Sequence, residues 1–349
     1  MPDFLPQLPA SWAPHLTPLF DASGALAHPV TRLCVAVVLG ALALTPLALL
    51  LLGALGRLSP ETRADAWLRY RTWLLIVPLV LGPILWCRAA AVVMLTVVAL
   101  LAYREFARAT GLFRAQVVSA VAAIGIVTLG VAALDHWYGL FVAVPSLAVA
   151  TMAGAAVLRD QPEGYIQRVA LGAVGLLLFG SAFLHLAYFT NAQHWRAVLC
   201  MLLLCTQGSD IAAYCFGKAF GSRRLFPNTS PRKTLAGHAG ALVVSATLCA
   251  LLGHQVFRGT AVDEWWRLAL LGVLVALGAQ AGDLVLGSIK RDLGLKDLAR
   301  FLPGHGGVTD RVNSLLLVAP VVFHFVGYFL RYSTGGGMTE PRRIITGGW

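Results

Sequence analysis

Long apolar stretches alternate with short polar segments along this chain. Ten of these stretches are apolar enough and long enough to form membrane-spanning helices, because a helix needs about 20 residues to cross the hydrocarbon core of a bilayer. They lie at residues 33–56, 73–87, 89–103, 115–134, 139–157, 169–190, 197–217, 236–253, 267–287 and 312–331. The pattern predicts an all-α fold, a polytopic membrane helix bundle with about ten transmembrane helices.

The second and third stretches are short and are divided only by Arg88. Pro78 and Pro83 are expected to kink the second one, because proline lacks the N–H group that a helix interior uses. No repeat or soluble domain interrupts the pattern. The expected divisions are a non-cytoplasmic N-terminal tail at 1–31, transmembrane helices at 32–195, a transmembrane region with two basic loops at 196–332 and a C-terminal tail at 333–349.

Composition agrees with a membrane setting. Hydrophobic residues make up 58% of the 349 positions and charged residues 12%, and the mean hydropathy is +0.75. The net charge of +11 does not indicate nucleic-acid binding, because the basic residues fall in short loops between apolar stretches. The six cysteines lie inside apolar stretches without metal-binding spacing, so they are expected to be small core residues.

The basic residues also predict an orientation. If the N-terminus is outside, five loops face the cytoplasm and hold 19 of the 27 Lys and Arg residues. This excess predicts that both termini are outside. The five loops are 57–72, 104–114, 158–168, 218–235 and 288–311.

Two aspartates lie inside predicted membrane helices, directly before the most basic loops. Asp210 precedes the loop at 218–235, and Asp283 precedes the loop at 288–311. A carboxylate in the hydrocarbon region costs a few kcal/mol unless it is paired or bound to a metal ion, so a functional role is expected. The alternative is a structural aspartate that is hydrogen-bonded or reaches the membrane surface.

The stretch that follows Asp283 is the most polar part of the chain. Lys290 and Arg291 share the helix face of Asp283, so groups that bind phosphate are expected above a group that binds a cation. Alternatively, the two basic residues anchor the helix at the membrane surface. The helix is expected to break at Gly294 and to be followed by Lys296 and Asp297.

A glycine turn then leads into the last predicted helix. Gly306 and Gly307 allow backbone N–H groups to approach phosphate oxygens, and His305 is a further hydrogen-bond donor there. Asp310 and Arg311 open the helix, and Asp310 is expected either to cap it or to share a cation with Asp283. A plain turn and a plain cap are the alternatives.

The other basic loop offers a second set of phosphate-binding groups. Ser230 and Lys233 stand just before the helix predicted at 236–253, whose N-terminal amides add further donors. The alternative interpretation is a set of basic anchors on the cytoplasmic side.

At this point the residues resemble the phosphatidate cytidylyltransferase (CDP-diacylglycerol synthase) family. The family's C-terminal signature is matched without a gap by Ile289-Lys290-Arg291, Lys296-Asp297, Ala299, Leu302-Pro303, His305-Gly306-Gly307-Val308 and Asp310-Arg311-Val312. An upstream block is similar at Asp210, Ala213-Tyr214, Phe216-Gly217-Lys218, Phe220-Gly221, Ser230-Pro231, Lys233-Thr234 and Gly237, and a short element at Tyr103-Arg104-Glu105-Phe106 also looks like one of the family's.

Three positions depart from the family pattern. Gly287 stands where the signature has Ser, Asn313 where it closes with Asp, and Ala236 where the upstream block usually has an acidic or amide residue. The change at Asn313 removes a negative charge beside the expected metal site, although an amide carbonyl can still bind a cation.

The resemblance implies that CTP and phosphatidate, with Mg²⁺, give CDP-diacylglycerol and pyrophosphate for phospholipid synthesis. It implies a site at the cytoplasmic face of a bacterial inner membrane, with a homodimer as a possible assembly and no nucleic-acid partner. One or two divalent cations are assigned to Asp283 and Asp310, with Asp210 and Asp297 as further candidates. The phosphates are assigned to Lys290, Arg291, Lys296 and Arg311, with Ser230, Lys233, His305, Gly306 and Gly307 completing the substrate site.

Other classes of protein remain as alternatives. The CDP-alcohol phosphotransferases are disfavoured, because their motif begins with Asp-Gly and this chain contains no Asp-Gly dipeptide. A catalytically weakened member of the family would act as a lipid-handling or transport protein. A cytidylyltransferase with a different lipid acceptor is the third possibility.

Overall fold

The computed structural model describes residues 13–158, 160–299, 301–334 and 343–346. The predicted tails therefore lie partly outside the described residues, at 1–12, 335–342 and 347–349. In chain order the elements are α1 (Ala13–Phe20), α2 (Pro29–Ala54), α3 (Pro60–Trp86), α4 (Arg88–Ala109), η2 (Leu112–Arg114), α5 (Gln116–Leu134), α6 (Tyr138–Val157), α7 (Tyr165–Gly175), η3 (Leu176–Ala182), α8 (Phe183–Tyr188), η4 (Phe189–Asn191), α9 (Trp195–Phe220), β1 (Arg224–Phe226), β2 (Ser230–Thr234), α10 (Leu235–Val256), α11 (Trp265–Asp292) and α12 (Thr309–Thr334).

The predicted all-α membrane bundle is confirmed. Within the described ranges, ten helical segments are long and apolar enough to cross a membrane, with α7 to η4 forming one continuous span over Tyr165–Asn191. Between α3 and α4 the break lies at Cys87, whose backbone is extended (φ −153°, ψ 166°). Lipid cannot hydrogen-bond backbone groups, so long helices are the expected solution for such a sequence. The chain is an integral membrane protein.

One predicted loop is largely helical. The stretch at 57–72 was expected to be a loop because it is basic, but α3 begins at Pro60 and runs through it. Ser59 caps this helix by accepting a hydrogen bond from the Thr62 N–H at 3.2 Å, and proline at the first helical position is compatible with a helix start. The helix therefore includes the polar stretch as well as the apolar one.

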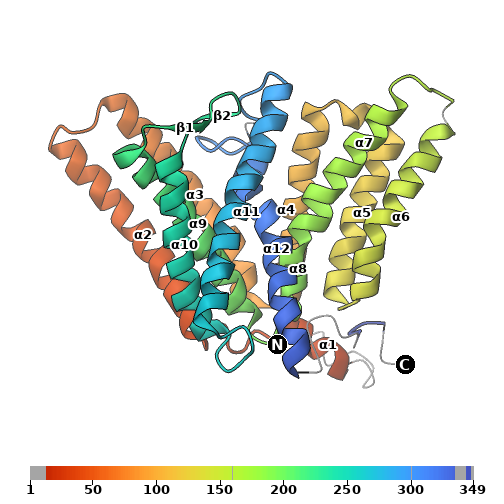
Figure 1. Ribbon diagram of the computed structural model, residues 1–349, viewed down its shortest axis with the longest axis horizontal. Helices are drawn as coiled ribbons and strands as arrows, with labels where there is room; N and C mark the ends of the chain where they lie inside the picture. The colour runs from red at the N-terminus through yellow and green to blue at the C-terminus, as the bar shows by residue number, and fades with distance from the viewer. Residues whose placement is uncertain (1–12, 159, 300, 335–342, 347–349) are drawn as a thin grey trace.

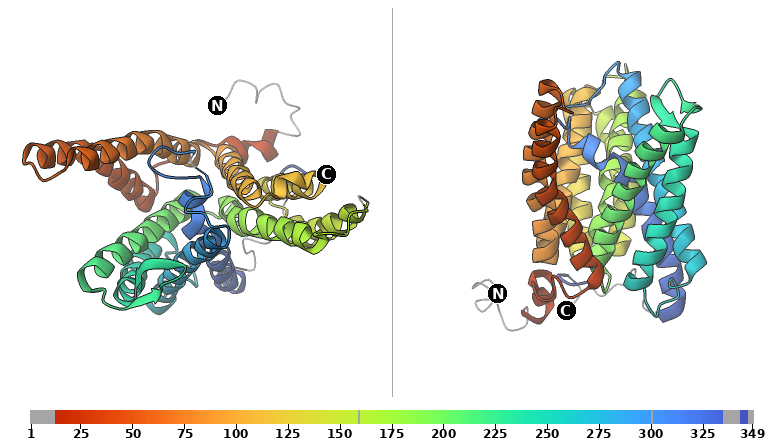
Figure 2. Two further views of the ribbon diagram at one scale, coloured as in Figure 1. Left: turned by 90° about the horizontal axis from the view of Figure 1, so that it is seen from above. Right: turned by 90° about the vertical axis from the view of Figure 1, so that its left-hand side faces the viewer.

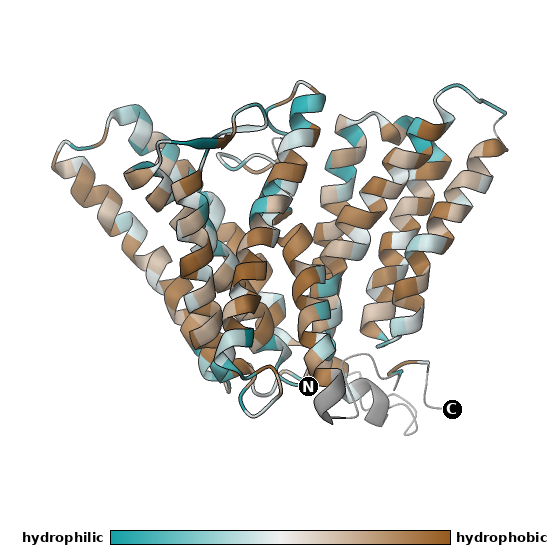
Figure 3. Cartoon of the chain, in the orientation of Figure 1, coloured by the Kyte–Doolittle hydropathy of each residue, from teal (hydrophilic) through white to brown (hydrophobic). Residues whose placement is uncertain are grey.

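The helices diverge from a centre near α12. Seen from above, α2 and α3 form one arm, α9 to α11 a second and α4 to α7 a third, while α12 lies where they meet (Figure 2). Apolar residues cover the helix surfaces, and polar residues gather at the two ends (Figure 3). On α2, Leu44 and Leu47 are 64% and 54% exposed, as expected for side chains that face lipid.

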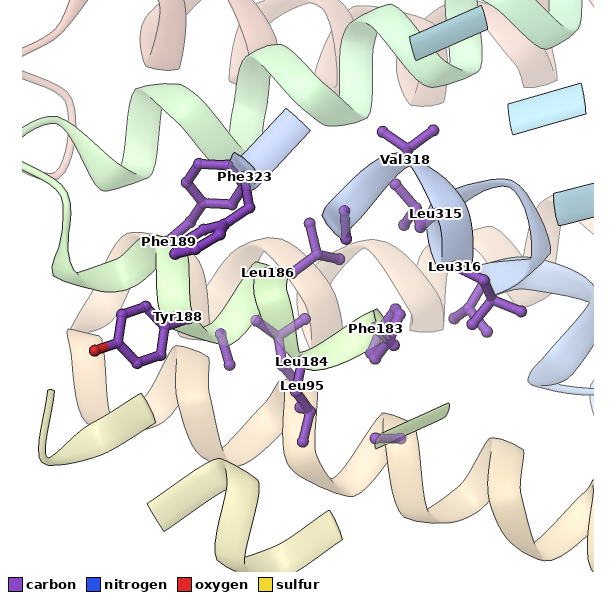
Figure 4. Packing of buried hydrophobic residues seen from close by; sticks show 14 of the residues in the cluster. Leu95, Phe183, Leu184, Leu186, Tyr188, Phe189, Leu315, Leu316, Val318 and Phe323 are labelled. Carbon is purple, nitrogen blue, oxygen red and sulfur yellow. The ribbon is translucent and has the colours of Figure 1, made fainter. Parts of the chain in front are cut away.

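The buried core extends over most of the helices and includes the place where α8 and α12 pack together. Phe183 and Phe189 of the α8 region are fully or almost fully buried, as are Leu316 and Phe323 of α12 (Figure 4). The rings of Phe189 and Phe323 meet edge to face, with centroids 5.2 Å apart. This packing holds α12 in place, and α12 carries part of the candidate site.

Both loops that matter for the site lie at one end of the molecule. The hairpin of β1 and β2, the end of α11 and the start of α12 are at the top of Figure 1, whereas α1 is at the bottom. Residues 343–346 join the α1 end, because the Asp135 carboxylate accepts hydrogen bonds from Ile345 N at 2.5 Å and Thr346 N at 3.0 Å. The two basic loops are therefore opposite both described terminal segments.

Candidate active site

The β-hairpin brings Lys233 to the middle of the candidate site. β1 and β2 pair antiparallel, and Lys233, near the end of β2, reaches α11. Its Nζ lies 3.0 Å from Asp283 Oδ2 and donates to the backbone carbonyl of Gln280 at 3.3 Å. The ammonium group therefore neutralises a carboxylate that the sequence places within the membrane helix.

Ser314 of α12 joins Asp283 to Asp210 of α9. Its Oγ lies 3.0 Å from Asp210 Oδ2 and 3.3 Å from Asp283 Oδ1, and the residue is 5% exposed. A hydroxyl group has one proton, so it can donate to only one of the two carboxylates at a time. Two carboxylates therefore converge on one buried hydroxyl, with negative charge in excess on that side.

The close crossing of α11 and α12 depends on Gly282. A Cβ atom at this position would lie 2.2 Å from the backbone oxygen of Asn313. Only glycine permits this approach. The crossing sets Asp283 and Ser314, the next residues of the two helices, beside each other.

Asp310 has a lysine partner of its own. Lys290 Nζ lies 2.8 Å from Asp310 Oδ1, and Gly307 N donates to Asp310 Oδ2 at 3.2 Å. Lys290 lies about two helical turns beyond Asp283 on α11, as the spacing predicts. A Cβ atom on Gly306 would lie 2.7 Å from Asp310 Oδ2 and 3.8 Å from Asp297 Oδ1, so the carboxylate of Asp297 is also nearby.

Glu105 of α4 binds the start of α12. Its carboxylate accepts hydrogen bonds from Val308 N at 2.8 Å and Thr309 N at 2.9 Å, and from the Thr309 hydroxyl. Glu105 is 8% exposed. These amides follow the glycine turn, in which Gly307 N donates to Asp310. Carboxylates of the chain therefore bind Gly307 N, one of the backbone donors expected to bind phosphate, and the two N–H groups that follow the turn.

The glycine turn also rests on α3. Thr72 Oγ1 donates to the Pro303 carbonyl at 2.8 Å, and the rings of Trp73 and His305 meet edge to face with centroids 5.6 Å apart. Gly304 has a φ of +73°, a conformation that favours glycine. Burial of the imidazole lowers the pKa of His305, so this side chain is neutral at neutral pH.

The remaining predicted phosphate ligands are more exposed. Arg291, Lys296 and Arg311 are exposed, and none of the three belongs to an ion pair within the described part of the chain. Ser230 is partly buried and pairs with Phe226 in the hairpin. These side chains remain predicted ligands, and the three charged ones are free to bind an anion.

The aspartate side chains of the candidate site lie in two pairs. In the described ranges, no group of three or more His, Cys, Asp or Glu side chains could hold a metal ion. Asp210 with Asp283 fits a magnesium ion, because this ion is usually bound by one or two carboxylates together with substrate phosphates. Asp297 with Asp310 is the other pair. The hydrogen bonds and ion pairs of the described residues do not link Asp283 with Asp310, so the shared cation expected from the sequence stays a prediction.

The three departures from the signature have definite surroundings. A Cβ atom on Gly287 would lie 3.2 Å from the Thr229 methyl group of the hairpin, so the absent serine side chain makes room for β1–β2. Asn313 Oδ1 accepts a hydrogen bond from Ser314 N at 2.9 Å. Ala236 lies in the first turn of α10, whose cap is Thr234 Oγ1 bound to Gly237 N.

Sequence reasoning missed the role of Ser314 and Thr72. A serine inside an apolar helix is common and carries no spacing signal. Thr72 lies in a stretch that was expected to be a loop. Glu105 belongs to the Tyr103–Phe106 element that resembles the family, but its contact with Thr309 is seen only in the structure.

The comparisons with known proteins identify the family of the chain. The model of the "Cytidylyltransferase family" matches residues 67–329. "Uncharacterized protein YnbB" of Escherichia coli is 34% identical over 190 residues, 53% of this chain and 62% of the relative. The "Phosphatidate cytidylyltransferase" of Mycobacterium tuberculosis is 40% identical over 144 residues, 41% of this chain and 42% of the relative.

A third relative is covered more completely. The "Phosphatidate cytidylyltransferase" of Brucella melitensis is 31% identical over 189 residues, 47% of this chain and 68% of the relative. The chain spans less than two thirds of the length of the E. coli and M. tuberculosis relatives. The match to the family model runs from α3 to α12 and includes every candidate site residue, and the chain therefore belongs to the cytidylyltransferase family.

Proposed function

We propose that this protein transfers the cytidylyl group of CTP to phosphatidate. A phosphate oxygen of phosphatidate attacks the α-phosphorus of CTP, a new P–O bond forms, and the bond to the β-phosphate breaks. The products are CDP-diacylglycerol and pyrophosphate. The observation that carries the proposal is the pair of lysine–carboxylate contacts, Lys233–Asp283 and Lys290–Asp310, held by separate segments within the region that matches the family.

The lysines are suited to binding the triphosphate. Each ammonium now neutralises one carboxylate, and a triphosphate offers both of them a partner of higher negative charge. The exposed Arg291, Lys296 and Arg311 supply further positive charge around the same end. The reaction brings two polyanions together, so charge neutralisation and orientation are the main contributions expected from the protein.

The carboxylates are suited to a divalent cation. Mg²⁺ would be held by Asp283 together with Asp210 or Asp310, and would neutralise charge on the triphosphate and on the departing pyrophosphate. Asp310 and Ser314 are four residues apart on α12 and share a helix face, so both lie on the side that Asp283 meets. The lysines would then be released from the carboxylates and become free for phosphate.

The acceptor needs no strong base. Its phosphate is already an anionic nucleophile, so the side chains act by placement rather than by removing a proton. The lipid reaches the site from the bilayer, and the α11–α12 loop exposes apolar Leu295 and Phe301, at 36% and 64%. We place this end at the cytoplasmic face, because the basic residues gather there.

The test uses purified full-length protein with Mg²⁺ and CTP labelled in the cytosine ring. We expect a labelled CDP-lipid only when phosphatidate is added, together with pyrophosphate in equal amount. A product formed only with another phospholipid would keep the donor and change the acceptor. No CDP-lipid from any phospholipid, with folded protein, would contradict the proposal and favour the lipid-handling alternative.

A further inference from the structure

Two buried polar side chains lie on the membrane-interior side of the carboxylates that Ser314 joins. Thr206 precedes Asp210 by four residues on α9, and Gln280 precedes Asp283 by three on α11. Residues at these spacings share a helix face. Both helices run toward the end that carries the β-hairpin (Figure 1). Thr206 and Gln280 therefore lie about one helical turn deeper than the carboxylates.

Neither polar group is satisfied by the protein. Gln280 is 6% exposed and Thr206 is fully buried, yet Gln280 Nε2 and Thr206 Oγ1 have no hydrogen-bond partner. Lys233 Nζ donates to the backbone carbonyl of Gln280. This contact fixes the turn of α11 but does not satisfy the side-chain amide. Buried polar groups are nearly always hydrogen-bonded in native proteins, so an acceptor from outside the chain is expected.

The depth of the two groups limits the chemistry of that acceptor. The charged side chains above them are the proposed phosphate ligands, whereas Thr206 and Gln280 are neutral and sit among apolar residues. Their acceptor is therefore expected to be uncharged. In a diacylglycerol phosphate the ester carbonyls follow the phosphate after the three-carbon glycerol unit, a separation comparable to one helical turn of about 5.4 Å.

Building on the function proposed above, we infer that Gln280 and Thr206 bind the ester carbonyl groups of the acceptor lipid. The amide N–H of Gln280 and the hydroxyl of Thr206 donate, and the carbonyl oxygens accept. The pair thereby sets the depth of the lipid, so that its phosphate reaches the level of Lys233 and Asp283. A lipid with ether-linked chains lacks these acceptors and binds less tightly.

Binding without CTP tests the inference directly. Full-length protein in detergent is titrated with dioleoyl phosphatidate and with its dialkyl ether analogue, which carries the same phosphate. Wild-type protein is expected to bind the diester about tenfold more tightly, the effect of one or two hydrogen bonds. Gln280→Met and Thr206→Val are each expected to reduce this preference severalfold, with the affinity for the ether lipid unchanged.

Ser245→Ala is the matched control. Ser245 is a fully buried residue of α10 whose hydroxyl also has no partner, but its backbone carbonyl packs against Gly272, eleven residues before Asp283. This variant is expected to keep the full preference for the diester. Thr206→Ser, which retains a hydroxyl group, is expected to restore the preference lost in Thr206→Val and shows that the packing survives.

Two results would overturn the inference. The first is an equal affinity of wild-type protein for the diester and the ether lipid. The second is an unchanged preference for the diester in both Gln280→Met and Thr206→Val. In either case a buried water molecule would be the partner of these groups. CDP-lipid formation is measured separately with CTP and Mg²⁺. Failure of wild-type protein to form product from either lipid contradicts the proposed function, while the binding preference still decides the ester contact.

Discussion

Glu105 of α4 and Thr309 of α12 are 204 positions apart in the chain, yet the Glu105 carboxylate accepts hydrogen bonds from both the backbone N–H and the hydroxyl of Thr309. The contact fixes the N-terminus of the helix that carries Asp310 and Ser314. A carboxylate at a helix N-terminus is favourable because the unpaired N–H groups point toward it. Glu105 is thus a positioning residue for two groups of the candidate site.

Glu105→Ala is expected to destabilise the protein and to lower activity. The change leaves the part-buried N–H group of Val308 and the buried N–H group of Thr309 without an acceptor, which costs about 2–4 kcal/mol in total. Glu105→Gln keeps one acceptor oxygen and is expected to lose less. Thermal unfolding in detergent and the KM for CTP measure the two effects. Glu61→Gln, an exposed carboxylate at the start of α3, is the control and is expected to change neither.

A purely structural role for Glu105 makes a different prediction. It would lower the unfolding temperature and the amount of folded enzyme, with KM for CTP unchanged in the folded fraction. A positioning role raises KM for CTP or lowers kcat in that fraction. An unchanged KM and kcat in folded Glu105→Ala would remove the residue from the site.

Asp283→Asn is expected to reduce turnover by about a hundredfold or more, as the loss of a principal electrostatic group in an active site does. The substitution leaves the Lys233 ammonium without its anionic partner and removes a cation ligand. Turnover is measured with saturating CTP and phosphatidate. Asp292→Asn, an exposed position at the end of the same helix, is expected to keep wild-type turnover.

Cation binding distinguishes an ion shared by Asp283 and Asp310 from an ion held by Asp210 and Asp283. Mn²⁺ binding by electron paramagnetic resonance is compared in Asp210→Asn, Asp283→Asn and Asp310→Asn. Loss of Mn²⁺ binding in Asp283→Asn and Asp310→Asn supports the cation shared across α11 and α12 that the sequence predicts. Loss of Mn²⁺ binding in Asp210→Asn and Asp283→Asn alone supports an ion at the carboxylates around Ser314. Wild-type affinity in all three variants would contradict both assignments.

Gly282→Ala is expected to abolish activity while the protein still inserts in the membrane. The added Cβ would lie 2.2 Å from the Asn313 carbonyl, so α11 and α12 must move apart and Asp283 loses its contact with Ser314. Activity and protease resistance in detergent are the measurements. Gly154→Ala on α6, where a Cβ meets nothing within 4 Å, is the control and is expected to be neutral.

The contact of His305 with Trp73 is expected to weaken in acid. Burial lowers the pKa of His305, so the unfolded chain binds this proton more readily than the folded one, and stability contributed by the neutral ring is lost as pH falls below about 6.5. Trp73 fluorescence, taken as the difference between wild-type protein and Trp73→Phe, is expected to change over that range. The same titration in His305→Gln is expected to be flat, and an identical curve would exclude His305.

Hydropathy alone was sufficient for the ten spans, because a backbone in lipid must satisfy its own hydrogen bonds. Helix periodicity also predicted that Lys290 lies on the same face of α11 as Asp283. The partners of the carboxylates could not be predicted from helix periodicity, because they depend on how closely the helices cross. Gly282 allows α11 to cross α12 closely beside Ser314, and the hairpin brings Lys233 to Asp283. The helical start of α3 could not be predicted in this way, because its basic residues favour a loop.

At the crossing of α11 with α12, main chain meets main chain, since the Asn313 carbonyl fills the space that a side chain on residue 282 would need. The spacing of the two helices is therefore independent of the side chain at position 313. Evolution can exchange an acid for its amide there and alter the local charge while the scaffold stays unmoved. The charge at position 313 can thus change without any change in the way the two helices cross.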